Sequence, residues 1–534
     1  MRCPVHPPSL DISRRTLLRQ AAWAGMATQL PRWARAQAAV RHDPFGLGVA
    51  SGDPVHDGVV LWTRVLPPAD LAGTHAPWAG PLTVRWELAD DAQFRHIVQR
   101  GTAMALPELG HSVHVEVAGL RPDRWYHYRF MLGDATSPVG RTRTAPAPDA
   151  LPGRLRLVFA SCQRWEHGHY AAWRHACADQ PDLVLFLGDY IYEYPSPQDA
   201  TGLARVHPLR LPRNLQDYRD RYALHKSDPA LQAAHACAPW AVTWDDHEVQ
   251  NDYAAGQGRG ERAEWLPLRS AAWQAFYEHM PLRVSTLAGS GFHQLQIHRR
   301  LLWGRLARLH MLDTRQYRDL QACRTPGKGA TGAVRPDACP EILDGHRSLL
   351  GWEQEQWLHA GLAADARNQA TRWSVMAQQT LFSPRRYPSG LQSTDSWDGY
   401  PAARDRLLQA LAQHPPRNTV LLGGDIHQNY VCNVMAPHGP HAHGAPRILA
   451  SEFCGTSISS CAGTTQDKVD AIARHNPHVL LARCEERGYG LCDITPTRWT
   501  ATLRALRDPL DAGSAAYTLA RFVVEDGRPG PQPA

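Results

Sequence analysis

The stretch LVLFLGDYIY, residues 183–192, decides the fold of this chain. Its first five residues are apolar without alternation, which is typical of a strand buried on both faces of a sheet. Gly188 then permits a tight turn, and Asp189 stands at the carboxyl end of the strand. Because open α/β sheets bind ligands at the carboxyl ends of their strands, this stretch predicts an α/β core with a site at that edge.

Further apolar runs of the same kind follow residue 154, and longer segments with helical spacing separate them. Each run ends in polar residues, as the first one does. The pattern predicts an α/β catalytic domain over residues 154–525, with buried strands at 155–160, 240–243, 309–312, 375–377 and 420–422.

Residues 40–145 instead alternate apolar and polar side chains in short runs, as at 82–88. Period-two alternation predicts a small all-β sandwich domain, and the stretch 119–128 resembles a fibronectin-III-type turn into a strand. Proline and glycine are dense at 146–153, which predicts a linker. The length of 534 residues suits two domains, because single cores rarely exceed ~250–300 residues.

The amino terminus carries the features of an export signal. A twin-arginine pattern, SRRTLL, occupies residues 13–18, a weakly apolar stretch follows at 21–30, and residues 34–36 offer a small-x-small cleavage site. These features predict a signal peptide at 1–36, a mature chain from about Gln37, and passage through the twin-arginine export machinery to the periplasm or the exterior. The alternative is a basic amphipathic helix. No later window approaches ~18 uninterrupted apolar residues, so we expect no transmembrane segment in the mature protein.

The bulk charge excludes one class of partner. The formal net charge is +6, but residues 1–36 hold six arginines and one acid, so the rest of the chain carries only +1. A near-neutral chain with 43% hydrophobic and 20% charged residues is globular, and we expect no nucleic-acid binding.

The chain has eleven cysteines, of which Cys3 would leave with the signal. In an oxidising compartment some of the others would pair. Cys323 and Cys339 bracket a loop rich in glycine and proline, so they are the best candidate disulfide. Two weaker candidate pairs are Cys454 with Cys461 and Cys484 with Cys492.

Two of the polar strand ends carry residues suited to cations. Asp189 supplies a carboxylate that can bridge two cations, and the phenolate of Tyr192 suits Fe(III). Asp246 can bind the second cation, while His247 beside it is free to donate a hydrogen bond to a substrate oxygen or to protonate a leaving group. The alternatives are an ordinary turn around Asp189 and a helix N-terminus over residues 245–248.

Two further strand ends add candidates. Asp425 and His427 are two residues apart, so in an extended segment both would point the same way and both could ligate. Cys162 could ligate as a thiolate. The alternatives are a satisfied core histidine and a small buried cysteine.

Taken together, the motifs Gly-Asp-x-x-Tyr, Asp-His-Glu and Gly-Asp-x-His resemble the binuclear metallophosphoesterases, nearest the purple-acid-phosphatase pattern. The departures from that pattern, with Cys162 in place of the usual first aspartate, resemble the alkaline phosphatase D (PhoD) family. Four longer stretches, at 46–54, 61–64, 312–318 and 452–457, are similar to that family as well.

The resemblance implies an α/β metallophosphoesterase core, a two-sheet sandwich, preceded by a fibronectin-III-like domain. It also implies that Asp189 bridges an Fe(III) and a Ca²⁺ ion, both of which suit the expected ligands. The other implied iron ligands are Cys162, Tyr192 and His427; the other implied calcium ligands are Asp246, Asp425 and Asn251.

The hypothesis that follows is an exported phosphoric ester hydrolase, an alkaline phosphomonoesterase that also cleaves diesters, acting on small phosphoesters. Metal-bound hydroxide would attack phosphorus in line, with His247 as general acid. Arg315 would clamp a phosphate oxygen, or else pair with Asp313 or another surface acid. Two alternatives stay open: a phosphodiesterase or phospholipase-like enzyme for lipids or wall polymers, and a polymer-binding protein, because the chain has 18 tryptophans.

Overall fold

The computed structural model describes residues 42–67, 78, 80–258, 262–287, 291–324, 332–437 and 447–534. The predicted signal peptide and the start of the mature chain lie outside the described residues. Within the described residues, every helix is too short or too polar to cross a membrane.

The N-terminal region is rich in strands, as the alternation predicts. Two sets of strands pack against each other through one apolar core, to which Val59, Leu61, Val84 and Tyr128 contribute. One set is β1 (Val49–Val55), β2 (Gly58–Arg64) and β5 (Ser112–Val117). The other is β3 (Leu82–Ala89), β4 (Ile97–Ala105), β6 (Trp125–Leu132), β7 (Ala135–Thr136) and β8 (Gly140–Arg143).

The first large sheet joins this region to the core. Its order is β24-β23-β22-β21-β9-β10-β11-β1-β2-β5, and the join is a parallel pairing of β1 with β11 at Gly52 and Trp240. The N-terminal strands therefore extend the core sheet, which the sequence pattern did not indicate. The core strands are β9 (Leu155–Ala160), β10 (Leu183–Phe186), β11 (Trp240–Val242), β21 (Gly488–Ile494), β22 (Arg498–Leu506), β23 (Ala516–Glu525) and β24 (Arg528–Pro533).

The second large sheet has the order β12-β13-β15-β17-β19-β18-β20, and β13, β15, β17 and β19 run parallel. All six predicted core strands are confirmed, three in each sheet. The strands of this sheet are β12 (Arg299–Trp303), β13 (Ala307–Met311), β15 (Trp373–Ala377), β17 (Thr419–Gly423), β18 (Asn429–Met435), β19 (Ile448–Cys454) and β20 (Val479–Arg483).

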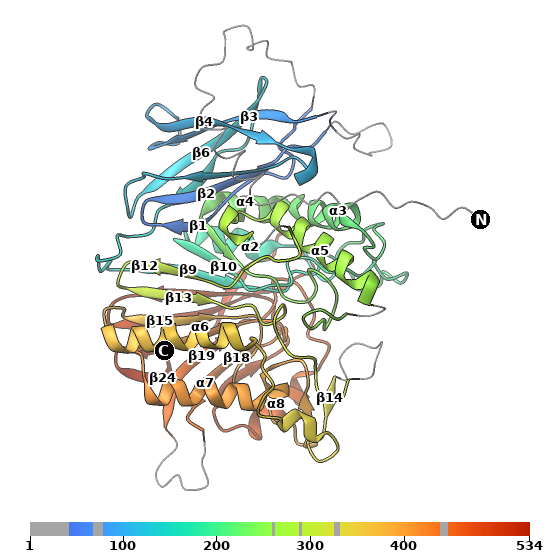
Figure 1. The fold of residues 1–534 in the computed structure, drawn as a ribbon, viewed down its shortest axis with the longest axis vertical. Coiled ribbons are helices and arrows are strands. Elements are labelled where there is room, and N and C mark those ends of the chain that lie inside the picture. The colour runs from blue at the N-terminus through green and yellow to red at the C-terminus, as the bar shows by residue number, and fades with distance from the viewer. Residues whose placement is uncertain are drawn as a thin grey trace, which may run out of the picture.

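The two large sheets share one buried core, in which Leu157 and Leu185 of the first sheet meet Leu309 and Val420 of the second. Helices pack on the other faces, and Figure 1 shows α6 and α7 lying across the second sheet. The mixed α/β architecture with a β-rich N-terminal region is thus confirmed. The helices are α2 (Ala171–Ala178), α3 (Leu215–Lys226), α4 (Pro229–Cys237), α5 (Arg262–His279), α6 (Trp352–Asn368), α7 (Pro401–Gln413) and α8 (Gln466–Arg474).

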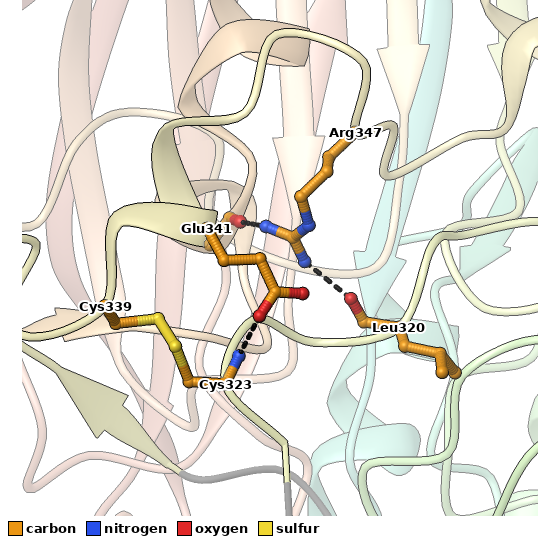
Figure 2. The surroundings of a disulfide bond; sticks show 6 residues. Leu320, Cys323, Cys339, Glu341 and Arg347 are labelled. Carbon is orange, nitrogen blue, oxygen red and sulfur yellow. Dashed lines mark hydrogen bonds between the residues drawn. A yellow bond between two sulfur atoms is a disulfide. The ribbon is translucent and has the colours of Figure 1, made fainter.

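The predicted disulfide between Cys323 and Cys339 is present, with the sulfurs 1.96 Å apart. Figure 2 shows its surroundings: the Cys323 N–H donates to the Glu341 carboxylate at 2.8 Å, and Arg347 donates to the Leu320 carbonyl. The bridge therefore closes a loop that is also held by polar contacts.

The two weaker candidate disulfides are wrong, because all four cysteines are free. Cys454 ends β19 and donates its thiol to the Gly424 carbonyl at 3.3 Å, whereas Cys461 is exposed. Cys492 faces the core between the two sheets, whereas Cys484 lies in a separate small cluster. The two cysteines of each pair are close in the sequence, but the fold places them in different surroundings.

Candidate metal centre

The site lies at the carboxyl ends of β9, β10, β11 and β17, in the loops that follow these strands. Four predicted ligands have left-handed backbone there: Cys162 (φ 59°), Asp189 (57°), Asp425 (65°) and His427 (55°). That conformation costs a side chain with a β-carbon roughly 1–2 kcal/mol. Such strain persists where the surroundings impose it, and it gathers at functional sites.

The first group of ligand atoms joins three loops. Donor atoms of Cys162, Asp189 and His427 all lie within 4.8 Å of one another. The Tyr192 hydroxyl donates to the Asp189 carboxylate at 2.9 Å and lies 2.9 Å from Nε2 of His427. The structure thus brings together the four residues predicted for iron.

The second group shares Asp189 with the first. Donor atoms of Asp189, Asp246 and His247 also lie within 4.8 Å of one another. Oδ1 of Asp189 and Oδ1 of Asp246 are buried and accept no hydrogen bond from any described residue. Buried oxygens without a partner are costly in proteins unless a cation or water completes them, so these residues fit a two-cation site.

The pKa values of the first group reflect this burial. Desolvation raises the pKa of the Asp189 carboxyl well above its usual range, and the charges of Asp246 and Asp245 add to the effect. Desolvation likewise raises the pKa of the Cys162 thiol and of the Tyr192 phenol. Without a cation these groups favour their neutral forms, and a bound cation would reverse that preference.

Asp425 and His427 diverge, so the predicted extended segment is wrong. Residues 425–428 form a bend, and the left-handed backbone at both positions breaks the alternation of an extended chain. His427 joins Cys162, whereas Asp425 is in neither ligand group. The pKa of Asp425 is raised to about 6, mainly by burial. The charge of Arg315 opposes this rise, and the charges of Asp246 and Asp395 add to it.

His247 is held by a carboxylate that lies outside the sequence motifs. Nδ1 of His247 lies 2.6 Å from Oε2 of Glu193, and the His247 ring packs against the Tyr192 ring at a tilt of 35°, with the ring centres 4.2 Å apart. Burial lowers the pKa of His247, but the charges of Glu193, Asp246 and Asp189 outweigh it and raise that pKa well above the ordinary value. Glu193 directly follows Tyr192 in the sequence, so a carboxylate next to a candidate metal ligand is the signal that could have identified it.

Glu193 also places Asn251, because its Oε1 accepts the Asn251 N–H at 2.9 Å. Asn251 thus stands just beyond the turn that carries Asp246 and His247. Its predicted role as a calcium ligand stays a prediction.

Residues 246–249 form a bend and a turn with no helix after them, so the alternative of a helix N-terminus over residues 245–248 is wrong. Glu248 ties this turn to the preceding one: its carboxylate accepts the N–H groups of Asp245 at 2.8 Å and of Tyr190 at 2.6 Å. A β-carbon on Gly188, whose φ is 107°, would lie 2.6 Å from Cβ of Asp245. Only glycine allows the two loops to approach this closely.

Arg315 is fully committed to carboxylates. It is 1% exposed, its Nε donates to Asp245, its Nη1 lies 2.8 Å from Asp395, and its Nη2 lies 3.7 Å from Asp246. The Asp313 carboxylate instead accepts the Arg315 backbone N–H at 2.9 Å. The structure therefore favours the ion-pair interpretation over a direct phosphate clamp, although the partners are buried acids.

Two further acids complete the surroundings. Asp246, Asp252 and Asp395 form a third group whose donor atoms lie within 4.8 Å. The Asp395 carboxylate also accepts hydrogen bonds from Arg318 and Gln321 at 2.7 and 2.8 Å. Asp252 and Asp395 stand in loops away from the apolar runs, so no strand end marked them in the sequence.

Comparison with known proteins agrees with these motifs. A family model described as "PhoD-like phosphatase" matches residues 157–503, and one described as "PhoD-like phosphatase, N-terminal domain" matches 32–146.

Alkaline phosphatase D of Bacillus subtilis (strain 168) is 44% identical over 497 residues, which cover 91% of this chain and 82% of that protein. A solved structure titled "Structure of PhoD" superposes with a TM-score of 0.85 at 41% identity and covers 93% of each chain. A Paenibacillus cycloisomaltooligosaccharide glucanotransferase matches over 71% of this chain and 45% of its own, but the TM-score of 0.17 at 9% identity shows no common fold. The chain therefore belongs to the PhoD-like phosphatase family and is a phosphoester hydrolase.

Proposed function

We propose that this phosphoester hydrolase is an exported, metal-dependent alkaline phosphomonoesterase that also cleaves diesters. The observation that carries the proposal is the pair of ligand groups that share Asp189. Phosphoryl transfer needs cations that neutralise the phosphate oxygens and the developing charge, and two adjacent cation positions supply them.

The proposed metals are one Fe(III) and Ca²⁺. Thiolate, phenolate and imidazole donors favour the iron on the Cys162 side, and an all-oxygen set favours calcium on the Asp246 side. When bound, these cations would acidify a water and polarise the phosphoryl oxygens. The proposed iron ligands are Cys162, Asp189, Tyr192 and His427, and the proposed calcium ligands are Asp189, Asp246, Asp425 and Asn251.

The side chains have separate roles in this mechanism. Nδ1 of His247 faces Glu193, so its Nε2 is the nitrogen left to donate a proton to the leaving oxygen. Glu193 fixes the orientation of the ring and stabilises its charged form. Arg315 acts as a positioning residue, because its guanidinium holds Asp245 and Asp395 at the site.

We also propose that the enzyme is exported and that it consists of two domains. The twin-arginine pattern at 13–18 supports delivery of a folded, metal-loaded enzyme to the periplasm or the exterior. The strands of residues 40–145, packed around one apolar core, support a fibronectin-III-like sandwich, and a catalytic domain at 154–525 follows the linker at 146–153.

The burial of the tryptophans argues against a polymer-binding protein. Ten tryptophans are fully buried. Among the described residues, Trp352 is the one tryptophan in the set of large apolar side chains that are exposed. A binding face needs exposed rings, whereas these rings fill the core. A phosphodiesterase or phospholipase-like enzyme remains the second candidate, because the same ligand groups serve either ester.

The deciding experiment compares p-nitrophenyl phosphate with its bis-ester at alkaline pH, using signal-cleaved protein with calcium, before and after chelation. Chelator-sensitive monoester turnover is the expected result, and turnover of the bis-ester alone would favour the diesterase. Elemental analysis of Asp189→Asn should show loss of both iron and calcium, whereas Asp246→Asn should lose calcium only. Metal-replete wild-type protein inactive on both esters would refute the proposal.

A further inference from the structure

One short loop contacts three of the four proposed iron ligands. It consists of residues 458–461, Ile-Ser-Ser-Cys, which lie between β19 and α8 and which we call the ISSC loop. Its first three residues are fully buried, and none of the sequence motifs includes them. Hydrogen bonds to metal ligands orient those ligands and tune their donor strength, so a loop in this position can do more than complete the fold.

The backbone of the ISSC loop holds Cys162. The Ile458 N–H donates to the Ser161 carbonyl at 3.0 Å, and the N–H groups of Ser459 and Ser460 donate to the Cys162 carbonyl at 3.4 and 3.3 Å. The carbonyl that accepts them belongs to a residue with left-handed backbone. The loop therefore helps to impose the conformation of this ligand.

The last residue of the loop selects the tautomer of His427. Nδ1 of His427 lies 2.7 Å from the Cys461 carbonyl, and because a carbonyl only accepts, the proton of the neutral imidazole stands on Nδ1. Nε2 then keeps its lone pair, and it lies 2.9 Å from the Tyr192 hydroxyl, among the other ligands. The ISSC loop thus leaves His427 ready to bind a metal through Nε2.

The third contact comes from a side chain. The Ser460 hydroxyl donates to the Tyr192 oxygen at 2.9 Å. Oγ of Ser460 in turn accepts the Arg164 N–H at 3.0 Å, which anchors the hydroxyl to the backbone of the loop after β9. Since the backbone N–H occupies an acceptor position of Oγ, the proton of Ser460 is directed at Tyr192.

A phenolate that binds a metal in a buried site needs such a donor. Among the described residues, the Tyr192 oxygen has hydrogen-bond partners in Asp189, His427 and Ser460. An ionised carboxylate and an unprotonated imidazole nitrogen only accept, so Ser460 is the one of these three that can donate to a phenolate. Tyr192 is 3% exposed, so solvent contributes little there. A hydrogen bond to the charged oxygen is stronger than one between neutral groups.

Ser459 shows what an ordinary buried serine does in the same loop. It is as buried as Ser460, but its hydroxyl donates to the Arg164 carbonyl at 2.7 Å. That hydrogen bond goes to a backbone group rather than to a ligand, and it serves the fold alone. The two adjacent serines therefore differ in whether the hydroxyl reaches the metal centre.

We propose that Ser460 is a positioning residue for the iron: its hydroxyl donates to the Tyr192 phenolate, fixes the orientation of the ring and withdraws electron density from the oxygen that binds the metal. A phenolate without this hydrogen bond donates more electron density to Fe(III) but is less well placed. This inference rests on the iron ligands of the proposed function, and it holds whichever phosphoester the enzyme prefers.

The test is the absorption spectrum of iron-loaded, signal-cleaved protein, because a phenolate bound to Fe(III) absorbs visible light by charge transfer from ligand to metal. Ser460→Ala should move this band to longer wavelength, since the phenolate then gives up electron density more readily. It should also weaken iron binding about 10–100-fold in competition with a chelator.

Ser460→Thr and Ser460→Val form a pair of equal shape in which only threonine keeps the hydroxyl. Threonine should restore most of the wild-type band and affinity, whereas valine should behave as alanine does. Ser459→Ala is the matched control in the same loop: it removes an equally buried hydroxyl and should leave the band in place. In Tyr192→Phe, which lacks the phenolate, Ser460→Ala should cause no further loss of iron affinity.

The inference is refuted if the wild type binds no iron or shows no such band. It is also refuted if the threonine and valine variants have the same spectrum, if Ser459→Ala shifts the band as much as Ser460→Ala, or if Ser460→Ala still weakens iron binding in Tyr192→Phe. Failure of the proposed function looks different: the band and its shifts would be present, but neither p-nitrophenyl phosphate nor its bis-ester would be hydrolysed.

Discussion

At the scale of single residues, four of the predicted ligands have a backbone that is held in an unfavourable conformation. Cys162 shows how it is held: its N–H donates to the Gly188 carbonyl at 3.1 Å, and its carbonyl accepts from Ser459 and Ser460. Such a residue cannot relax without breaking contacts in three loops. The ligand geometry is therefore set before any cation arrives, which reduces the free energy needed to order it on binding.

The dependence of kcat on the leaving group of the ester tests the role of His247. A general acid matters most when the leaving oxygen is a poor one, so His247→Gln should lower kcat on glycerol 3-phosphate roughly 10²–10⁴-fold. The loss on p-nitrophenyl phosphate should be far smaller, because nitrophenolate leaves without a proton. Steady-state kinetics on the two esters measure the difference.

Glu193→Gln serves as the companion variant, since it keeps the size of the side chain and removes its charge. Like His247→Gln, it should lower kcat more on glycerol 3-phosphate than on p-nitrophenyl phosphate, but by a smaller factor. Equal losses on both esters in His247→Gln would assign His247 to binding rather than to proton transfer.

At the scale of elements, the strands were predictable and the loops were not. Runs such as 183–186 are apolar throughout because both faces of the strand are buried, and the residues themselves show that requirement. The bend at 425–428 depends on contacts with distant loops, among them the one between His427 and Cys461, and no local sequence pattern indicates such contacts. Asp395 was missed for the same reason.

The disulfide between Cys323 and Cys339 should contribute measurably to the stability of the protein. The cysteines are 16 residues apart, and a cross-link of that span stabilises a protein by about 3 kcal/mol in the chain-entropy model. Replacing both with alanine should lower the melting temperature by several degrees, measured by thermal unfolding. Reductant should lower that of the wild type but leave the double variant unchanged; an equal response in both would locate the sensitivity elsewhere.

At the scale of the whole molecule, the N-terminal strands and the core hold each other through buried polar contacts. Trp62 of β2 donates to the Glu278 carbonyl at 3.0 Å, and Arg299 of β12 pairs with Asp53 of β1 at 2.6 Å. The ring of His114 in β5 stacks on Tyr277 at 4.5 Å and lies 2.9 Å from the Met280 carbonyl. These contacts make the interface sensitive to ionisation.

Acid should weaken this interface through His114. Burial lowers the pKa of His114 to about 4, against about 6.5 in the unfolded chain, so the folded state binds fewer protons. Its contribution to stability is fully present above pH 6.5 and is lost as the pH falls from 6.5 towards 4. Between pH 7 and pH 5 the loss is roughly 1–2 kcal/mol.

Urea unfolding at both pH values tests this contribution. His114→Gln keeps a donor for the carbonyls but cannot be protonated, so its stability should fall less with acid than that of the wild type. An identical fall in both proteins would assign the acid sensitivity to other buried histidines.

The ten-stranded sheet also governs the order in which the chain can fold. Gly52 pairs with Trp240, and β9 pairs with β21, so neighbours in the sheet are synthesised far apart in time. Pairings of such large sequence separation make folding slow, and until Trp240 emerges the edge of β1 exposes unpaired backbone groups that can recruit another chain. A nascent chain of this protein therefore needs shielding during synthesis, and expression hosts should differ in yield according to the chaperones that cover that edge.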